Sequence, residues 1–420
     1  MITEPLLGFA RLFRAAMAGA DLAPLQAHLI EQATQHPGEA ATLLDLSTVL
    51  QLTLNHDAAL EVQAQALHMR QQYRVALSAP DAPSASPRDL SAASASPREP
   101  LRGFRVLALL SAGDFMANTP LECLLEGSGA TLDLLYVDTT LPFPEVVPEH
   151  DVLFVAVGEN ERNRPLLAWL AERLRCWSRP VINHPAQVLA LSREGVCARL
   201  QGTEGLVVPA VARHHRTNAV EAAGGIGYPL LVRPLGSHGG HDLAKIDSPN
   251  ELKGYLGAHA DDELYLTPFV DYRGVDGLFR KYRVALIDGQ PFLCHLAISK
   301  HWMIHYLNAG MSESAEKRAE EAQAMATFDD TFARRHAAAL GAVQDRMGLD
   351  YLVLDCGETR DGRLLLFEAD QCMVVHAMDS SDLFPYKAPQ MRKVFDAFAR
   401  MLKARASRSA NGTARAGMRA

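Results

Sequence analysis

The 420-residue sequence lacks most features of exported, membrane-bound or nucleic-acid-binding proteins. No apolar run approaches the ~18 residues that can span a bilayer. The first residues lack the long apolar segment and cleavage site of a signal peptide. A net charge of -8 creates no global field that would attract nucleic acid. We therefore expect a cytoplasmic protein with no membrane or nucleic-acid partner.

Cysteine is also scarce, with six residues and no C-x-x-C pair. This spacing argues against a disulfide framework and against a zinc cage. Several of the cysteines lie in apolar, strand-like contexts, so we expect reduced cysteines in the protein core.

The N-terminal part contains no clear strand pattern. In residues 1–77, Leu, Ala and Phe recur at helical intervals. Part of this pattern, ending a repeat at Pro37, fits a tetratricopeptide repeat, and an ordinary helical bundle fits equally well. Residues 78–102 are rich in Pro, Ser and Ala and predict a flexible linker. Residues 403–420 are basic and aperiodic and predict a disordered tail.

Residues 103–185 show a different organisation. Apolar strand candidates alternate with helical stretches, and their sequences are FRVLALL, LDLLYV, DVLFVAV and RPVIN. Alternation of this kind predicts βαβ units and a parallel sheet.

Residues 186–402 predict an α+β domain with antiparallel hairpins. Asp288-Gly289 and Asp361-Gly362 each separate two strand-like runs, which is a strong hairpin signal. The predicted fold class is therefore multidomain: a helical module, a parallel α/β domain and an α+β domain.

The last hairpin carries three carboxylates. Asp355 ends its first strand, and Glu368 and Asp370 lie two residues apart near the end of its second. Period-two geometry points Glu368 and Asp370 to one face, and cross-strand pairing can bring Asp355 beside them. Oxygen ligands of this kind suit Mg²⁺ bound to nucleotide phosphates. The alternative is a set of acidic strand ends in solvent.

Two other segments offer groups that could bind phosphates. Arg233 precedes a glycine-rich turn whose backbone N–H groups could approach phosphate oxygens, although a plain tight turn is the alternative. Lys281 and Arg283 share one strand face, with Lys300 after the next strand, where a solvated basic strand is the alternative. The turn residues are Gly236, Ser237, His238, Gly239 and Gly240.

The order of these segments resembles the ATP-grasp superfamily over roughly residues 104–400. The branch that it most resembles contains glutathione synthetase, D-alanine-D-alanine ligase and the ligases that add glutamate to ribosomal protein. The resemblance implies a pre-ATP-grasp domain at 103–185 and an ATP-grasp domain at 186–402. It also implies an ATP- and Mg²⁺-dependent ligase that forms an amide bond through an acylphosphate.

The resemblance also implies roles for individual residues. Arg233 and the glycine-rich turn would hold the phosphates, and Arg283 and Lys300 would act on the transferred group. The hinge that binds adenine would be Thr267, Pro268, Phe269 and Val270. The magnesium ligands would be Asp355, Glu368 and Asp370.

Two positions depart from the family pattern. Gly195 stands where a phosphate-binding lysine is usual. Lys281 stands near the position of an acidic or amide residue that contacts ribose, so Asp271 or Asp276 could take over that contact.

These departures leave a second function open. A catalytically weak or inactive ATP-grasp scaffold could use its helical module to bind a peptide or protein. For the ligase, the substrates would be a carboxylate and an amine, each a small molecule or a peptide, and a homo-oligomer stays open.

Overall fold

The computed structural model describes residues 5–75, 77, 103–237 and 240–417, so the predicted linker at 78–102 lies outside the described residues. The chain divides into two compact units. Unit 1 comprises Met1–Val188, Leu349–Tyr351 and Gln371–Ala420, and unit 2 comprises Leu189–Gly348 and Leu352–Asp370. No helix in the described part of the chain is long and apolar enough to cross a membrane.

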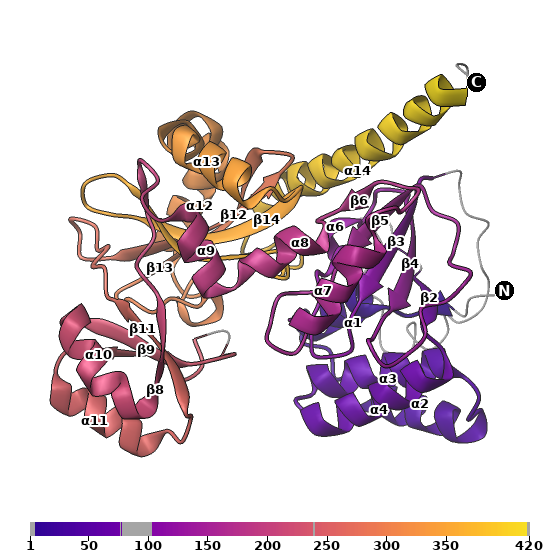
Figure 1. Ribbon diagram of the computed structural model, residues 1–420, viewed down its shortest axis with the longest axis horizontal. Coiled ribbons are helices and arrows are strands. Elements are labelled where there is room, and N and C mark those ends of the chain that lie inside the picture. The colour runs from indigo at the N-terminus through magenta and orange to yellow at the C-terminus, as the bar shows by residue number, and fades with distance from the viewer. Residues whose placement is uncertain (1–4, 76, 78–102, 238–239, 418–420) are drawn as a thin grey trace. The chain divides into compact units, whose positions relative to one another are not determined.

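Unit 1 begins with four helices around a common apolar core (Figure 1, indigo). The core includes Leu12, Leu25 and Val49, which come from three different helices. The predicted helices of this region are confirmed, and their assignment as a tetratricopeptide repeat stays a prediction. The helices are α1 Phe9–Met17, α2 Ala23–Gln35, α3 Ala40–Leu52 and α4 His56–Met69.

A six-stranded sheet in the order β1-β2-β4-β3-β5-β6 forms the rest of the core of unit 1. Its last four members in this order pair in parallel, which confirms the parallel sheet predicted from residues 103–185. The four strands are β3 Arg105–Leu110, β4 Thr131–Tyr136, β5 Val152–Val155 and β6 Val181–Ile182. The helices along this part are α6 Leu121–Leu124, α7 Arg164–Arg173 and α8 Pro185–Val188.

The N-terminal module contributes two strands that the sequence did not predict. Strand β2, Gln72–Val75, pairs antiparallel with β4, and β1, Pro5–Leu6, pairs in parallel with β2. Arg74 binds Asp133 of β4 with a 2.8 Å contact from Nε to Oδ1. Strands of two and four residues are too short to show a periodicity. Their pairing partners also lie far away in sequence, so no local hairpin signal marks them. The helical module is therefore joined to the sheet through hydrogen-bonded strands.

Residues 403–417, which the sequence predicted to be part of a disordered tail, lie in a helix. Helix α14 runs over Lys387–Gly417 (Figure 1, yellow). Phe398 is buried and lies 5.8 Å from Phe154 between ring centroids. Arg405, inside the predicted tail, donates from Nε to Asp350 over 2.9 Å. The tail is rich in Ala and Arg, which favour helix, and this contact helps hold it.

Unit 2 contains a four-stranded antiparallel sheet in the order β10-β9-β11-β8. Two helices, α10 Ala219–Ile226 and α11 Pro249–Ala258, pack on it around Leu230 and Leu252. The strands are β8 Ala212–His215, β9 Leu230–Pro234, β10 Ala244–Ile246 and β11 Glu263–Pro268.

The second sheet of unit 2 has the order β13-β12-β14-β15-β7. Both hairpins predicted from Asp-Gly turns are confirmed, and positive φ angles at Asp288 (49°) and Gly289 (79°) suit the first turn. The strands are β7 Leu206–Val207, β12 Phe279–Ile287, β13 Gln290–Ser299, β14 Tyr351–Glu358 and β15 Leu364–Asp370. The helices are α9 Arg193–Leu200, α12 Ala315–Thr327, a π-helical turn Asp329–Ala333 and α13 Ala337–Met347.

Asn183, directly after β6, provides a test of unit 1. Its fully buried side chain donates to the Tyr351 carbonyl (2.7 Å) and to Gln371 Oε1 (2.6 Å), and it accepts from the Tyr351 N–H (3.0 Å). Asn183→Gly keeps the positive φ accessible but removes all three bonds. We expect it to lower the free energy of unfolding by about 3 kcal/mol in urea titrations. Gln65→Ala, at an exposed position of α4, should change it by less than ~0.5 kcal/mol, and equal effects would contradict the prediction.

Candidate functional site

The three predicted carboxylates lie in the hairpin of β14 and β15. Asp355 is directly opposite Glu368, and Val353 is opposite Asp370. Because residues two apart in a strand share a face, Asp355, Glu368 and Asp370 lie on one face of the sheet. The strand register therefore places the three carboxylates on one face of the hairpin, and their convergence on a metal ion stays a prediction.

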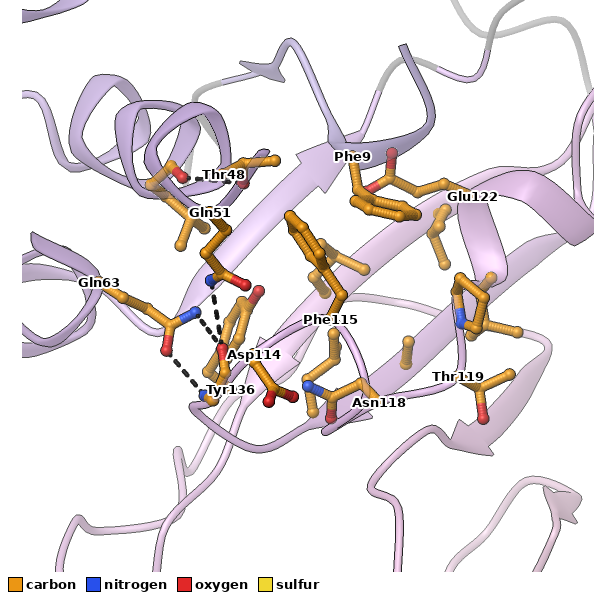
Figure 2. A pocket seen from close by; sticks show the side chains of 18 residues that line it. Phe9, Thr48, Gln51, Gln63, Asp114, Phe115, Asn118, Thr119, Glu122 and Tyr136 are labelled. Atoms are coloured by element: carbon orange, nitrogen blue, oxygen red, sulfur yellow. Dashed lines mark hydrogen bonds between the residues drawn. The ribbon is translucent and has the colours of Figure 1, made fainter. Parts of the chain in front are cut away.

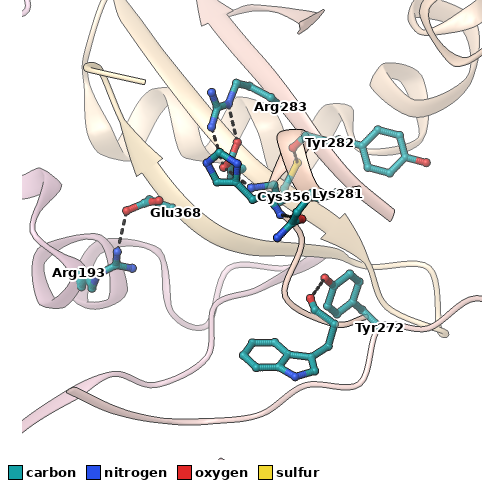
Figure 3. A network of polar contacts seen from close by, with 11 residues as sticks. Arg193, Tyr272, Lys281, Tyr282, Arg283, Cys356 and Glu368 are labelled. Carbon is teal, nitrogen blue, oxygen red and sulfur yellow. Dashed lines mark hydrogen bonds and ion pairs between the residues drawn. The ribbon is translucent and has the colours of Figure 1, made fainter. Parts of the chain in front are cut away.

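Asp355 is held by two cations from the neighbouring strand β12 (Figure 3). Lys281 Nζ lies 2.9 Å from Oδ2, and Arg283 contacts both oxygens, with Nε 2.8 Å from Oδ1 and Nη2 3.0 Å from Oδ2. Only 4% of Asp355 is exposed. Burial alone would raise the pKa of this carboxyl, but Arg283 and Lys281 hold it well below its usual range. Asp355 is therefore an ionised carboxylate in a largely buried ion triad.

Glu368 pairs with a cation that the sequence analysis did not identify. Arg193, at the start of α9, donates from Nη2 to Glu368 Oε1 over 2.7 Å (Figure 3). Gly195 is in the same helix, and a Cβ there would lie 2.6 Å from the Ala190 carbonyl oxygen. A lysine cannot fit at Gly195, and Arg193 supplies a positive charge two residues earlier. Its position at the opening of this helix was the signal that could have identified it.

Arg233 is a further cation near enough to this carboxylate for their charges to interact. It lies in β9, and the electrostatic influence of Arg193 and Glu368 reaches it. Burial and the neighbouring Arg193 lower the pKa of Arg233 to about 10. We call Lys281, Arg283, Arg193, Arg233, Asp355 and Glu368 the charged cluster. Four cations and two carboxylates leave the cluster with an excess of positive charge, which suits a polyanionic ligand.

The glycine-rich turn between β9 and β10 starts beside Arg233. Arg233 Nε donates to Ser237 Oγ over 2.9 Å, and its Nη2 contacts the Ser237 carbonyl. Gly236 and Gly240 have φ angles of 70° and 79°, which other residues rarely adopt. His238 and Gly239 lie outside the described residues. The phosphate-binding role of the turn stays a prediction.

The predicted adenine hinge occupies the end of β11. Thr267 Oγ1 donates to the Ala210 carbonyl over 2.7 Å, and the Phe269 N–H donates to the Pro229 carbonyl over 3.1 Å. The Phe269 ring packs edge-on against Trp302 at 5.7 Å. Because Pro268 has no N–H and that of Phe269 is used, an adenine contact here would depend on the Pro268 carbonyl and on Val270.

Two predicted site residues are not brought into the charged cluster. Asp276 binds Arg280, with 2.6 Å from Nη2 to Oδ2, and this pair lowers the Asp276 pKa to about 2. Arg280 alternates with Lys281 along β12, so it occupies the opposite strand face. Lys300 is exposed just after β13 and makes no hydrogen bond or ion pair to another described residue. The roles proposed for Asp276 and Lys300 stay predictions.

The carboxylates fit a divalent cation only in part. In the described part of the chain, no group of three or more His, Cys, Asp or Glu side chains could hold a metal ion. Both oxygens of Asp355 are taken by Lys281 and Arg283. Glu368 and Asp370 share a face and have the hard oxygen atoms that Mg²⁺ prefers. Their assignment as metal ligands stays a prediction.

Comparisons with known proteins gave matches among solved structures alone. No protein-family model and no curated protein matches the chain. It is similar to a "RimK domain protein ATP-grasp" from Sphaerobacter thermophilus, with 16% identity, 71% of this chain and 99% of the other covered, and a TM-score of 0.42. It is also similar to D-alanine–D-alanine ligase from Bacillus anthracis complexed with ATP (14%, 73% and 100%, TM-score 0.46). A third is the VanG D-Ala:D-Ser ligase from Enterococcus faecalis (11%, 72% and 100%, TM-score 0.46).

The ion triad predicts a pH dependence of stability. Because the folded-state pKa of Asp355 is depressed, its stabilisation is present above the ordinary carboxyl pKa of 3.8 and is lost as pH falls below that value. Asp355→Asn should lower the free energy of unfolding by about 3 kcal/mol at pH 7, since it leaves two partly buried cations without their anion. The difference from the wild type should shrink between pH 4 and pH 2.5 in urea titrations.

The matched control is Asp345→Asn, in an exposed position of α13. It should leave both the stability at pH 7 and its acid dependence nearly unchanged. An Asp355→Asn protein that loses no stability at pH 7 would contradict the ion triad.

Proposed function

We propose that this chain is an ATP-grasp ligase that joins a carboxylate to an amine at the expense of ATP. The observation that carries this proposal is the charged cluster, in which Lys281, Arg283, Arg193 and Arg233 converge on Asp355 and Glu368 beside a glycine-rich turn. The order of these elements along the chain, with the resemblance noted from the sequence, supports the same assignment. The substrates proposed are an amino acid or peptide carboxylate and a small-molecule or peptide amine.

The charge of the cluster favours a triphosphate over a neutral ligand. Arg233 and Arg193 are close enough for like-charge repulsion to lower the pKa of Arg233. A phosphate chain placed between them would relieve that repulsion and would form charge-assisted hydrogen bonds. The backbone of the turn after Arg233 would cover the phosphates, with the adenine at Thr267–Val270.

In the proposed reaction, an oxygen of the substrate carboxylate attacks the γ phosphorus, and the bond to the β–γ bridging oxygen breaks. This gives ADP and an acylphosphate. The amine then attacks the acyl carbon, phosphate leaves, and the amine nitrogen loses one proton. Arg283 and Lys300 would stabilise the charge on the transferred group. The glycine-rich turn would exclude water that hydrolyses the acylphosphate.

Glu368 and Asp370 would hold Mg²⁺, with Asp355 as a third candidate ligand. The ion would neutralise part of the phosphate charge. Asp355 also acts without it, because it orients Lys281 and Arg283 on β12.

The ion triad also favours the alternative function. An Asp355 whose two oxygens are held by cations is less available to a metal than a free carboxylate. A scaffold that binds nucleotide weakly, and binds a peptide or protein through α1–α4, would have this property. Calorimetry distinguishes the two, since the scaffold would show no turnover and weak or absent Mg-ATP binding.

The first prediction from this proposal concerns substrate dependence. In a screen over amino acids and short peptides, ADP release by the full-length protein should require both a carboxylate and an amine. A coupled assay for ADP, with a stoichiometric assay for the amide product, measures this. ADP release that ignores the amine would indicate ATP hydrolysis instead of ligation.

The second prediction concerns the charged cluster. Arg233→Met should lower kcat/KM by about 10²-fold or more, because it removes a positive charge from the transferring phosphates. Glu368→Ala should lower it similarly and raise the Mg²⁺ concentration needed for half-maximal rate. Lys253→Met, on the exposed side of α11, is the control and should keep full turnover. Full turnover by Glu368→Ala would count against its role as a magnesium ligand.

A further inference from the structure

Unit 1 contains a pocket that includes no residue of the charged cluster, the glycine-rich turn or the predicted adenine hinge. It lies between the N-terminal helices and the sheet, with strands β3 and β4 as its floor (Figure 2). The cavity holds about 90 Å³. At ~30 Å³ for a water in the liquid, this is space for about three waters or a compact group of four or five heavy atoms.

The floor of the pocket is apolar and its walls are aromatic. Ala108 and Leu110 of β3 face it together with Leu132 and Leu134 of β4. Three aromatic rings are also part of the lining, and two of them pack with ring centroids 5.0 Å apart and an interplanar angle of 48°. The rings are Phe9, Phe115 and Tyr136.

One buried polar atom in this pocket lacks a partner. Gln51 is only 5% exposed, and no hydrogen-bond partner for its Oε1 exists among the described residues. Its Nε2 donates to the Gly113 carbonyl at 3.4 Å. Gln63 also binds Gly113: its Nε2 donates to the carbonyl at 3.0 Å, and its Oε1 accepts from the N–H at 2.8 Å. Figure 2 shows the Gln51 amide in the pocket wall beside Phe115. A buried carbonyl oxygen without a partner is costly and is a ready acceptor for an N–H or O–H donor.

The charge of the lining has one sign. Asp114 and Glu122 line the pocket, and no Lys, Arg or His is among the described residues that do so. Burial raises the pKa of Glu122, and the charge of Glu122 helps to raise the pKa of nearby Asp45. Glu122 accepts the Ala10 N–H at 2.9 Å. A cation would stabilise this carboxylate, and aromatic rings attract cations as well.

We propose that this pocket binds a small primary amine, with its ammonium group toward Gln51 Oε1 and the carboxylates and its short alkyl part on the floor. An ammonium group donates three hydrogen bonds and carries the charge that the lining lacks. The alkyl part matches Ala108, Leu110 and the neighbouring leucines. Every lining residue belongs to unit 1, so this site is separate from the charged cluster and stands whether or not the ligase proposal does.

The first experiment is calorimetry of the full-length protein with three probes of equal length. These are n-butylammonium, n-butanol and butyrate, at pH 7 and constant ionic strength. We expect saturable binding of n-butylammonium at least ~10-fold tighter than that of n-butanol, and no binding of butyrate. Equal binding of the amine and the alcohol, or binding of none of the probes, would overturn the proposal.

Two variants locate the binding at this pocket. Gln51→Met removes the acceptor at similar volume, and Glu122→Gln removes the negative charge. Each should weaken n-butylammonium binding by about 10-fold or more. Gln35→Met, in an exposed position of α2, is the matched control and should bind like the wild type. If both pocket variants bound the amine as tightly as this control, the proposed site would be wrong.

A third variant covers a failure of Glu122→Gln to fold, since Glu122 also accepts the Ala10 N–H. Asp114→Asn changes an exposed carboxylate at the mouth of the pocket. It should weaken n-butylammonium binding and leave n-butanol binding unchanged. An unchanged affinity for the amine in Asp114→Asn and Gln51→Met together would also overturn the proposal.

Discussion

The ion triad of Asp355, Lys281 and Arg283 is the constraint on which the rest of unit 2 depends. A carboxylate with 4% exposure cannot stay ionised without compensating charge, and β12 supplies two cations on one strand face. The triad therefore fixes β12 beside β14 with Lys281 and Arg283 on the face that carries Glu368. The cation positions follow from this packing and do not require a ligand to order them.

The excess of cations in the charged cluster has a chemical consequence. Arg193 neutralises Glu368, and Arg233 lies close enough to be affected by both. Because Asp355 and Glu368 are already paired with cations, an added anion would meet the remaining positive charge of the cluster. It would not depend on a bound metal ion for that attraction. An ATP-dependent ligase and a purely anion-binding scaffold both require this excess of positive charge. They differ in whether Asp355 and Glu368 are available to bind Mg²⁺.

The sequence revealed the features that local patterns determine. Both Asp-Gly hairpins and the parallel strands of residues 103–185 followed from short-range signals, and the hairpin register placed Asp355 opposite Glu368. It missed β1 and β2, whose pairing depends on β4, more than fifty residues away along the chain. It also missed Arg193, which opens the helix that carries Gly195 and stands two positions before the expected cation.

The helical module is joined to the sheet directly, through strands at both of its ends. Two of its strands belong to the sheet, and a buried carboxylate, Asp45, accepts the N–H groups of Leu7 (2.8 Å) and Gly8 (3.2 Å) beside them. Burial raises the pKa of Asp45 to about 7, so the charge of this carboxyl depends on how deeply it is buried. A ligand between the helices and β3–β4 would therefore contact both layers, because the pocket is lined by residues of both and β2 ties the helices to β4.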